Sequence, residues 1–281
     1  MNKDGTACLF KFLYFMGTFF IILGGESMRE WKEALNKFLA RYEDEDYYEG
    51  AIACGSYVAG NNNEYSDIDV HIVLKEGNLW RERGNLEVDG FLIEYFANPV
   101  NRYEKYFEEE SNDFNCTTIA MFANGEIVRD INGEVSKLKE KASQAVKSDV
   151  RDLTEFELLS SKYGCWDKLD ELTVIYSEKR DNFYLAYYEL YKELIVLHGK
   201  VKKIRKVSLT KLDKLLDDKL FRDKYGISKF YDEYDTCLIR ECMVLDTRDK
   251  MMEKITSFYN HVMELSGGFD INKFVLRSDV K

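Results

Sequence analysis

Residues 51–74 read AIACGSYVAGNNNEYSDIDVHIVL, and this stretch decides the fold. Its first four residues predict a short apolar strand that ends at Gly55 and Ser56. A polar loop follows, and the chain then alternates polar and apolar side chains from Asp67 onward. In a strand this alternation places Asp67 and Asp69 on one face. Two carboxylates are therefore expected side by side, near the Gly-Ser end of the preceding strand.

This arrangement is suited to phosphate and metal binding. A strand that ends in Gly-Ser exposes backbone N–H groups and a hydroxyl, which hold phosphate oxygens. Paired carboxylates on the next strand are hard oxygen ligands that suit Mg²⁺. A third carboxylate, Glu94, lies on a later predicted strand; Asp89 is close to it in sequence, but its place in a turn already accounts for it. The sequence therefore predicts a phosphate-and-metal site built on three strands.

The sequence around this stretch predicts a small α/β domain. Apolar residues recur at helical spacing over 28–43, which indicates an amphipathic surface helix. Its expected buried residues are Trp31, Leu35, Phe38, Leu39 and Tyr42. Asp89-Gly90 favours a two-residue hairpin turn between strands at 86–88 and 91–96, because both residues tolerate positive φ. The remaining predicted elements are a helix over 100–110, a strand over 126–129 and a polar helix over 134–147.

From Leu153 onward the pattern is entirely helical. Three apolar stripes with spacings of three and four residues require partner helices. The stripes are Phe156, Leu159, Tyr163 and Trp166; Phe183, Tyr187, Leu190, Leu194 and Leu197; and Ile255, Phe258, Val262 and Leu265. Four tyrosines could line a substrate pocket or fill the bundle, and the core is the favoured place for them: Tyr184, Tyr187, Tyr188 and Tyr191. The predicted class is α+β, with a small mixed-sheet domain over 28–148, an all-α helical bundle over 149–281, and a substrate cleft between them.

The net charge argues against some classes of partner, and the cysteine content indicates a cellular location. The 281-residue chain has 40 Lys and Arg against 51 Asp and Glu, a net charge of −11. Binding to nucleic acid or to an anionic membrane needs clustered basic side chains, so this balance argues against both kinds of partner. Six cysteines without a C-x-x-C pair indicate reduced thiols in a cytoplasmic protein. A cationic or small polar substrate suits the acidic charge better.

A few basic and histidine residues need separate interpretation. The basic run over 200–206 has the charge to grip a triphosphate, but such a run is usually a solvated connector. Lys211 is the better candidate for nucleotide binding. His71 shares the face of the paired carboxylates and is expected either to support them indirectly or to be a spectator. His198 and His261 fall on predicted helices, where a histidine is more often a structural residue than a ligand.

Residues 1–27 form a separate apolar segment. The run from Leu9 to Leu23 is interrupted by Lys11 and is shorter than the roughly 20 residues of a membrane-spanning helix. Residues 24–27 lack the A-x-A pattern of a signal-peptide cleavage site. They include Gly-Gly-Glu, which purine-rich codons resembling a ribosome-binding site can encode. We therefore expect the native protein to start at Met28, with a membrane anchor or a signal sequence as the alternatives.

The signature around the paired carboxylates resembles a known superfamily. Cys54-Gly55-Ser56 and Ser66-Asp67-Ile68-Asp69-Val70 match the hG[GS]…DhDh pattern of the DNA polymerase beta-like nucleotidyltransferases, which also have a later strand-borne carboxylate. The chain looks most like the bacterial antibiotic nucleotidyltransferases, the lincosamide enzymes more than the aminoglycoside ones. The stretches that carry this likeness are GSYVAGNNNEYSDIDVHIVLKEG and IAMFANGEIVRDINGEVSKL. The helical remainder is less similar, although Leu209-Thr210-Lys211 resembles a lysine motif of related bacterial sequences.

The resemblance implies transfer of a nucleoside monophosphate from an NTP, with ATP favoured, to a hydroxyl of a small acceptor, and release of pyrophosphate. A lincosamide or an aminoglycoside is the implied acceptor, and antibiotic resistance the implied role. The implied nucleotide-binding residues are Gly55, Ser56, Ser66 and Lys211. The implied metal ligands, for two Mg²⁺ ions, are Asp67, Asp69 and Glu94, and Glu94 would also orient or deprotonate the acceptor hydroxyl. Related enzymes often form homodimers, which is the implied assembly.

Two other functions stay open. The first is nucleotidylation of a protein partner, as in antitoxin-type nucleotidyltransferases, although those resemble a bare catalytic domain and this chain has a long helical half. The second is a nucleotide sensor without catalytic activity. The presence of all three carboxylates argues against loss of activity.

Overall fold

The computed structural model describes residues 30–111, 114, 116–205, 208–224, 227 and 229–277. The apolar segment over 1–27 and the expected start at Met28 lie outside these residues. The chain divides into two compact units. The first contains the described residues up to Glu104 together with Gly125–Glu140, and the second contains Lys105–Asn124 and the described residues from Lys141 onward. The domain boundary expected between residues 148 and 149 stays a prediction.

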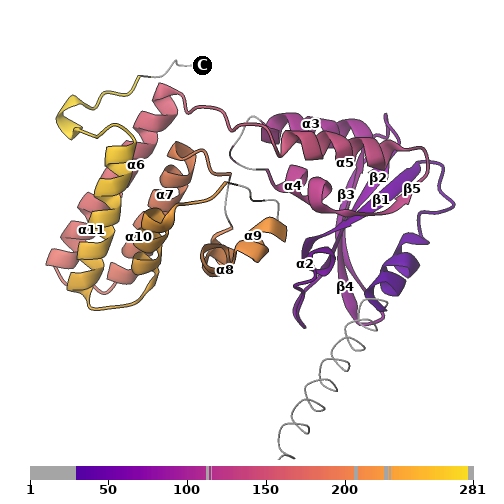
Figure 1. Ribbon diagram of the computed structural model, residues 1–281, viewed down its shortest axis with the longest axis horizontal. Coiled ribbons are helices and arrows are strands. Elements are labelled where there is room, and N and C mark those ends of the chain that lie inside the picture. Colours follow the sequence, from indigo (N-terminus) through magenta and orange to yellow (C-terminus); the bar gives the residue numbers. More distant parts are fainter. Residues whose placement is uncertain are drawn as a thin grey trace, which may run out of the picture. The chain divides into compact units, whose positions relative to one another are not determined.

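The first unit is built on a five-stranded mixed sheet with the strand order β3-β4-β2-β1-β5 (Figure 1). The strands are β1 (Tyr48–Cys54), β2 (Ile68–Leu74), β3 (Glu82–Val88), β4 (Phe91–Pro99) and β5 (Glu126–Asp130). β2 and β4 run parallel, and the other neighbouring pairs run antiparallel. This sheet and the helices of the second unit confirm the predicted α+β class. Because β2 is in the middle of the order, its residues have strand neighbours on both sides.

β3 and β4 form the hairpin that the Asp89-Gly90 pair predicts. Asp89 has a φ of 50° and Gly90 a φ of 83°. Two consecutive positive values are what a type I′ turn requires, and its twist matches that of the flanking strands. The turn pairs Val88 with Phe91 and so sets the register of the whole hairpin. The place of Glu94 along β4 follows from that register.

The two faces of β2 have different surroundings. Its apolar residues are fully buried and form one cluster with the helix over 30–39. The residues of the first predicted helix that were expected to be buried are all buried, namely Trp31, Leu35, Phe38, Leu39 and Tyr42. On the other face, Tyr103 of α3 (Val100–Ser111) donates a hydrogen bond to the Phe96 carbonyl at 2.7 Å. α5 (Glu134–Ala145) follows β5, close to the bounds predicted for it.

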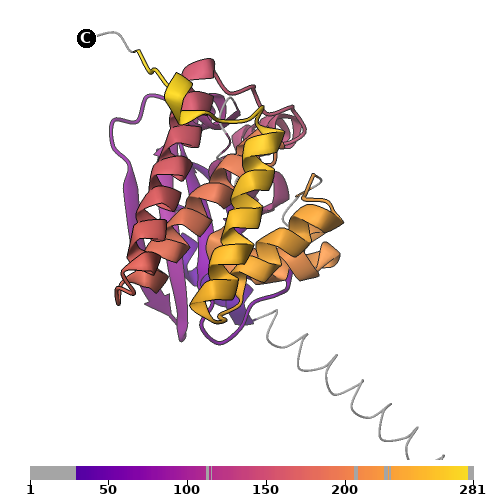
Figure 2. The same ribbon diagram turned by 90° about the vertical axis from the view of Figure 1, so that its left-hand side faces the viewer.

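The second unit is helical (Figure 2). Its helices are α4 (Thr117–Asn124), α6 (Glu155–Ser177), α7 (Phe183–Val201), α8 (Leu212–Asp217), α9 (Lys219–Lys224), α10 (Glu233–Met243) and α11 (Arg248–Leu265). The sequence does not predict α4, because a helix of eight residues is too short to give a clear periodic pattern. On α11 the predicted stripe is buried at Ile255, Phe258 and Val262, but Leu265 is 40% exposed.

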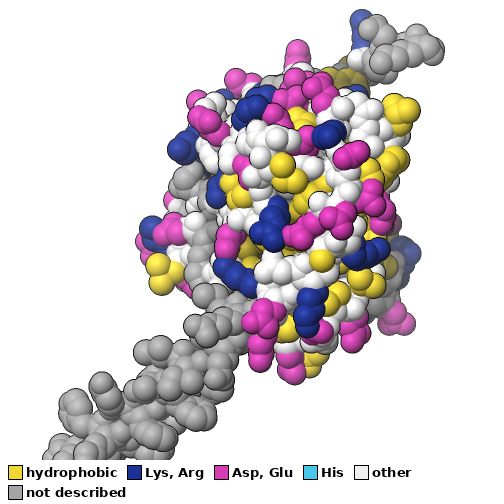
Figure 3. Space-filling model, turned by 90° about the vertical axis from the view of Figure 1, so that its right-hand side faces the viewer, with side chains coloured by type: hydrophobic (Ala, Val, Ile, Leu, Met, Phe, Trp, Pro, Cys, Tyr) yellow, Lys and Arg dark blue, Asp and Glu magenta, His cyan; other side chains and the backbone are white. Residues whose placement is uncertain are grey.

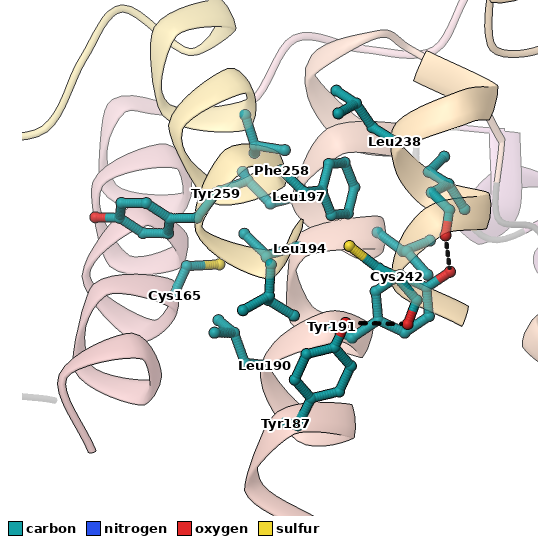
Figure 4. Packing of buried hydrophobic residues seen from close by; sticks show 14 of the residues in the cluster. Cys165, Tyr187, Leu190, Tyr191, Leu194, Leu197, Leu238, Cys242, Phe258 and Tyr259 are labelled. Carbon is teal, nitrogen blue, oxygen red and sulfur yellow. Dashed lines mark hydrogen bonds between the residues drawn. The ribbon is translucent and has the colours of Figure 1, made fainter. Parts of the chain in front are cut away.

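α7 contributes the centre of the helical core, and its predicted stripe from Phe183 to Leu197 is buried. Figure 4 shows two of its tyrosines pointing toward α10. The hydroxyl of Tyr187 donates to the Cys242 carbonyl at 3.1 Å, and that of Tyr191 to the Ile239 carbonyl at 2.7 Å. The expectation of a core position is wrong for the other two tyrosines, which are 41% and 37% exposed. Those two, Tyr184 and Tyr188, lie on the outer face of α7.

Helices cover the stripe predicted on α6 only in part, with Trp166 packed against the helical core. Phe156 is 46% exposed, and the face that α6 buries instead includes Cys165 and Ile175. Tyr163, within the predicted stripe, stacks on Phe274 with ring centroids 4.4 Å apart. The segment that follows α11 therefore covers part of the stripe, and a spacing pattern alone does not distinguish an irregular segment from a helix as the partner.

Three further features of the described residues are the state of the cysteines, the apolar character of the helices and the distribution of surface charge. Free thiols in the described part of the chain are Cys54, Cys116, Cys165, Cys237 and Cys242. None of the described helices has the length and apolar character needed to cross a membrane. Acidic and basic side chains are interspersed on the face that Figure 3 shows, whereas a nucleic-acid-binding face concentrates basic ones.

Candidate active site

Three carboxylates converge near the start of β2, in the middle of the sheet of the first unit. Asp67 immediately precedes β2, Asp69 lies within β2, and Glu94 lies on the parallel neighbour β4. The strand register places Asp69 directly beside Glu94. One oxygen of each of the three carboxylates lies within 4.8 Å of the others, and all three residues are partly exposed. The structure thus brings together the three acidic residues that the sequence singles out.

The Gly-Ser end of β1 lies against the same cluster. Cys54 pairs with Asp69 across the β1–β2 ladder, and Gly55 follows with a φ of +74°. A Cβ atom at position 55 would collide with Oδ2 of Asp69. Glycine is therefore required both by its backbone conformation and by the close approach of the carboxylate. The chain then turns into the short helix α2 (Gly55–Ala59), which starts with Gly55 and Ser56 beside the cluster.

Ser66, which the family resemblance implies as a nucleotide-binding residue, is engaged in its own loop. Its hydroxyl accepts a hydrogen bond from the Asn63 N–H at 2.9 Å, and its N–H donates to the Asn63 carbonyl at 3.0 Å. The Asn63 side chain accepts from the Tyr65 N–H at 2.9 Å. These bonds shape the polar loop that leads into Asp67, so Ser66 supports the position of the carboxylates.

Glu94 has a basic partner that the sequence analysis missed. Nη2 of Arg83, on β3, lies 2.7 Å from Oε1 of Glu94. The guanidinium also lies over the Phe96 ring, with 4.8 Å between Cζ and the ring centroid. Arg83 faces Phe96 in the β3–β4 register, so Glu94 is its diagonal neighbour. The register of the predicted Asp89-Gly90 turn places the two residues diagonally across the hairpin, but it does not determine that their side chains meet.

His71 lies outside the group of three carboxylates. It is buried, and its Nδ1 lies 3.3 Å from the hydroxyl of Tyr103. Its ring stacks on Phe96 with centroids 5.1 Å apart. Burial lowers the pKa of His71 to about 4, so the imidazole is neutral near pH 7. Asp89, the other acid near Glu94 in sequence, accepts from the Lys37 ammonium at 2.5 Å within its turn.

Burial and the charge of the carboxylates also raise the pKa of two nearby groups. Burial, followed by the negative charge of Asp69, raises the pKa of the Cys54 thiol well above its ordinary value. Burial and the charge of Asp67 raise the pKa of Tyr57. Both groups therefore stay protonated at neutral pH and do not compete as anions beside the carboxylates.

Lys211 lies in the second unit, at a cavity of about 270 Å³. Four further basic residues line this cavity, namely Lys147, Lys203, Arg205 and Lys229, against the single acidic residue Asp149. The basic run over 200–206 is only in part a solvated connector. Lys203 pairs with Asp152 at 2.8 Å, and Arg205 donates to the carbonyls of Ala145 and Ser148 at 3.1 and 3.0 Å.

Comparison with known proteins gives a family match that includes the three carboxylates. Residues 33–121 match the family model described as a nucleotidyltransferase domain. No curated protein matches the sequence. Among solved structures, a nucleotidyltransferase-like protein from Exiguobacterium sibiricum 255-15 is similar with a TM-score of 0.40 and 13% identity, over 84% of this chain and 77% of that one. The family match, with the three carboxylates inside it, supports the nucleotidyltransferase superfamily for this chain.

Proposed function

We propose that this protein transfers a nucleoside monophosphate from an NTP, preferentially ATP, to a hydroxyl group of a small acceptor. The observation that carries the proposal is the convergence of Asp67, Asp69 and Glu94 beside Gly55, inside the matched residues. A lincosamide or aminoglycoside is the acceptor class that we propose, from the sequence resemblance. Cytoplasmic location, a homodimeric assembly and a role in antibiotic resistance belong to the same proposal.

The donor set fits magnesium. Three carboxylates with oxygens within 4.8 Å of one another offer the all-oxygen coordination that Mg²⁺ takes in proteins. Asp67, Asp69 and Glu94 would hold the ion or ions. Bound Mg²⁺ offsets the negative charge that develops on the departing pyrophosphate.

The protein's own groups have distinct roles in this proposal. Gly55 and Ser56 bind phosphate oxygens through backbone N–H groups and the serine hydroxyl. Glu94, whose side chain is 20% exposed, accepts the proton of the acceptor hydroxyl as its oxygen bonds to the α-phosphorus. The bond between the α-phosphorus and the pyrophosphate oxygen breaks in the same in-line displacement. Arg83 orients Glu94 through their ion pair.

Lys211 is a further residue that we propose to bind nucleotide. It lines a cavity with an excess of basic side chains, on a chain whose net charge is −11. Such a local reversal of charge suits a phosphate-bearing ligand. A Lys211→Gln variant tests this role through the KM for the NTP, with Lys214→Gln, on the following helix α8, as the control.

The direct test combines purified protein, ATP or GTP, Mg²⁺ and a pooled panel of lincosamides and aminoglycosides. Mass spectrometry then scores each compound for the addition of one nucleoside monophosphate. A modified compound establishes the reaction and names the acceptor. Release of pyrophosphate without a modified compound points to another acceptor, such as a protein. Binding of the NTP with neither product overturns the enzymatic proposal in favour of a nucleotide sensor.

A further inference from the structure

Three helices of the second unit bring two histidines and an aspartate together. His198 lies on α7, Asp235 on α10 and His261 on α11. Oδ1 of Asp235 lies 3.1 Å from Nε2 of His198 and 2.7 Å from Nε2 of His261. One potential ligand atom from each residue lies within 4.8 Å of the others. These residues are 26 or more positions apart in sequence, so only the packing of the helices creates the cluster.

His198 is the fully buried histidine of this cluster. His198 is 0% exposed, and neither of its ring nitrogens has a hydrogen-bond partner. Its Nε2 lies close to Oδ1 of Asp235, but the contact lacks the alignment of a hydrogen bond. Buried polar atoms in folded proteins nearly always have a partner, and exceptions call for an explanation such as an ion. A ligand bound between the His198 ring and the Asp235 carboxylate would give Nε2 of His198 a partner.

The distances between the three groups suit a small metal ion. Zinc bonds of about 2.0–2.2 Å to nitrogen and oxygen place neighbouring ligand atoms of a tetrahedral site about 3.3 Å apart. The separation of 3.1 Å between His198 and Asp235 is close to that edge, and the 2.7 Å separation at His261 requires only a small outward movement. Two imidazoles and one carboxylate form a donor set that zinc favours and that Mg²⁺ does not.

A lysine and two aromatic rings surround the cluster and hold its side chains in place. The Lys202 ammonium lies 2.7 Å from Oδ2 of Asp235, which leaves Oδ1 facing the two histidines. Partners of this kind fix the orientation of metal-binding carboxylates. The Tyr231 ring stacks on His198 with centroids 4.9 Å apart, and Phe258 packs against it edge-on at 5.5 Å. The His261 side chain is 16% exposed and offers an entry path for an ion.

We propose that His198, Asp235 and His261 form a zinc site that ties α7, α10 and α11 together, with water in the fourth position. The site lies within the helical unit and is separate from the Asp67, Asp69 and Glu94 cluster of the first unit. It does not depend on the proposed function. Its effect is to stabilise the helical unit, since an ion that binds only the folded state raises the melting temperature.

The test uses the full-length protein, stripped with a chelator and then titrated with ZnCl₂ or CoCl₂ alone. We expect one tightly bound zinc ion per chain after dialysis, a rise in Tm with zinc, and the intense visible absorption of tetrahedral Co²⁺. Oxygen-only coordination at the three-carboxylate cluster gives only the weak bands of octahedral Co²⁺. Weak cobalt bands in the wild-type protein, with no dialysis-stable zinc, would overturn the proposal, and this readout needs no variant to fold.

Variants then assign the ligands. His261→Gln changes the most exposed ligand and should weaken zinc binding at least tenfold and abolish the tetrahedral cobalt spectrum. Glu264→Gln removes an exposed acid from the same helix and should leave zinc binding unchanged. A double variant, Asp67→Asn with Asp69→Asn, should also retain the dialysis-stable zinc. Loss of that zinc in the double variant, with retention in His261→Gln, would place the ion at the carboxylates and contradict the proposal.

Discussion

Arg83 on β3 reaches diagonally across the hairpin to Glu94 on β4, where its Nη2 lies 2.7 Å from Oε1 of the carboxylate. The residue directly opposite Glu94 is Asn85. The acid proposed to act on the acceptor hydroxyl therefore carries a positive partner on the edge strand of the sheet. The Arg83 side chain is 70% exposed, so solvent screens much of its charge.

Replacing Arg83 with glutamine should strengthen binding of a divalent ion at the carboxylates, because it removes a competing positive charge. Exposed ion pairs contribute about 0.2–1 kcal/mol, so the expected gain in Mn²⁺ affinity is about 1.4- to 5-fold. Electron paramagnetic resonance of free Mn²⁺ during a titration measures it. Arg129→Gln is the matched control, since it removes the similar Arg129–Glu43 pair on β5, at the opposite edge of the sheet. Equal affinities in Arg83→Gln and wild type would show that the guanidinium does not influence the site.

Asp69→Asn should lower the rate of nucleotidyl transfer by about 100-fold or more, because a charged group aimed at the reacting phosphates is lost. The Tm should change little, since the side chain is partly exposed. Asp89→Asn is the control: its carboxylate pairs with Lys37 in the hairpin turn and lies outside the cluster. Near-normal transfer by Asp69→Asn would contradict the assignment of the site.

Glu94→Gln separates the proposed chemistry from binding. The amide cannot accept the acceptor's proton, so kcat should fall by about 100-fold while the Kd for the NTP rises only a few-fold. Single-turnover kinetics and equilibrium binding measure the two quantities. An unchanged kcat would contradict the role of Glu94 as the proton acceptor.

The sequence specified the sheet side of the molecule well because local rules determine it. Alternation in 67–74 places the two aspartates, and the Asp89-Gly90 turn sets the register of Glu94. What the sequence did not reveal depends on contacts between distant residues. The Arg83–Glu94 pair requires the side chains to bend diagonally, and the cluster of His198, Asp235 and His261 requires three helices to pack in one arrangement.

The helical half shows the same limit. Spacing of apolar residues identified the helices, but it did not say which partner each face meets. Within the α6 stripe, Tyr163 stacks on Phe274 of the C-terminal segment, whereas Trp166 packs against the helical core. Tyr184 and Tyr188 share a helix with Tyr187 but lie on its outer face. An aromatic residue at a helix position is favoured in many environments, so its type alone does not determine burial.

Gly55 and Gly60 have the same backbone conformation, so a comparison of the two positions distinguishes the cost of backbone strain from the cost of a steric clash. Gly55 and Gly60 have φ values of +74° and +69°, but a Cβ meets Asp69 only at position 55 and open space at position 60. Gly60→Ala should therefore lose about 1–2 kcal/mol of stability from left-handed strain alone. Gly55→Ala should lose clearly more and should also displace Asp69 and reduce transfer. Urea denaturation of both variants measures the difference, and equal losses would contradict the close approach seen at Gly55.

His71 should make the first unit sensitive to acid. Its pKa is lowered to about 4 by burial, whereas an unfolded histidine titrates near 6.5. Between these values the unfolded chain binds a proton that the folded state does not, so stability is fully present above about pH 6.5 and falls as the pH approaches 4. The maximum loss of stability from this residue is about 3 kcal/mol.

His71→Gln should flatten that part of the stability profile, measured by urea denaturation from pH 4 to 7 in EDTA. His198, whose pKa burial also lowers to about 4, remains in the variant and contributes its own dependence, so the comparison isolates the share of His71. Identical slopes in variant and wild type would mean that the folded protein admits a proton to His71 as readily as the unfolded chain does.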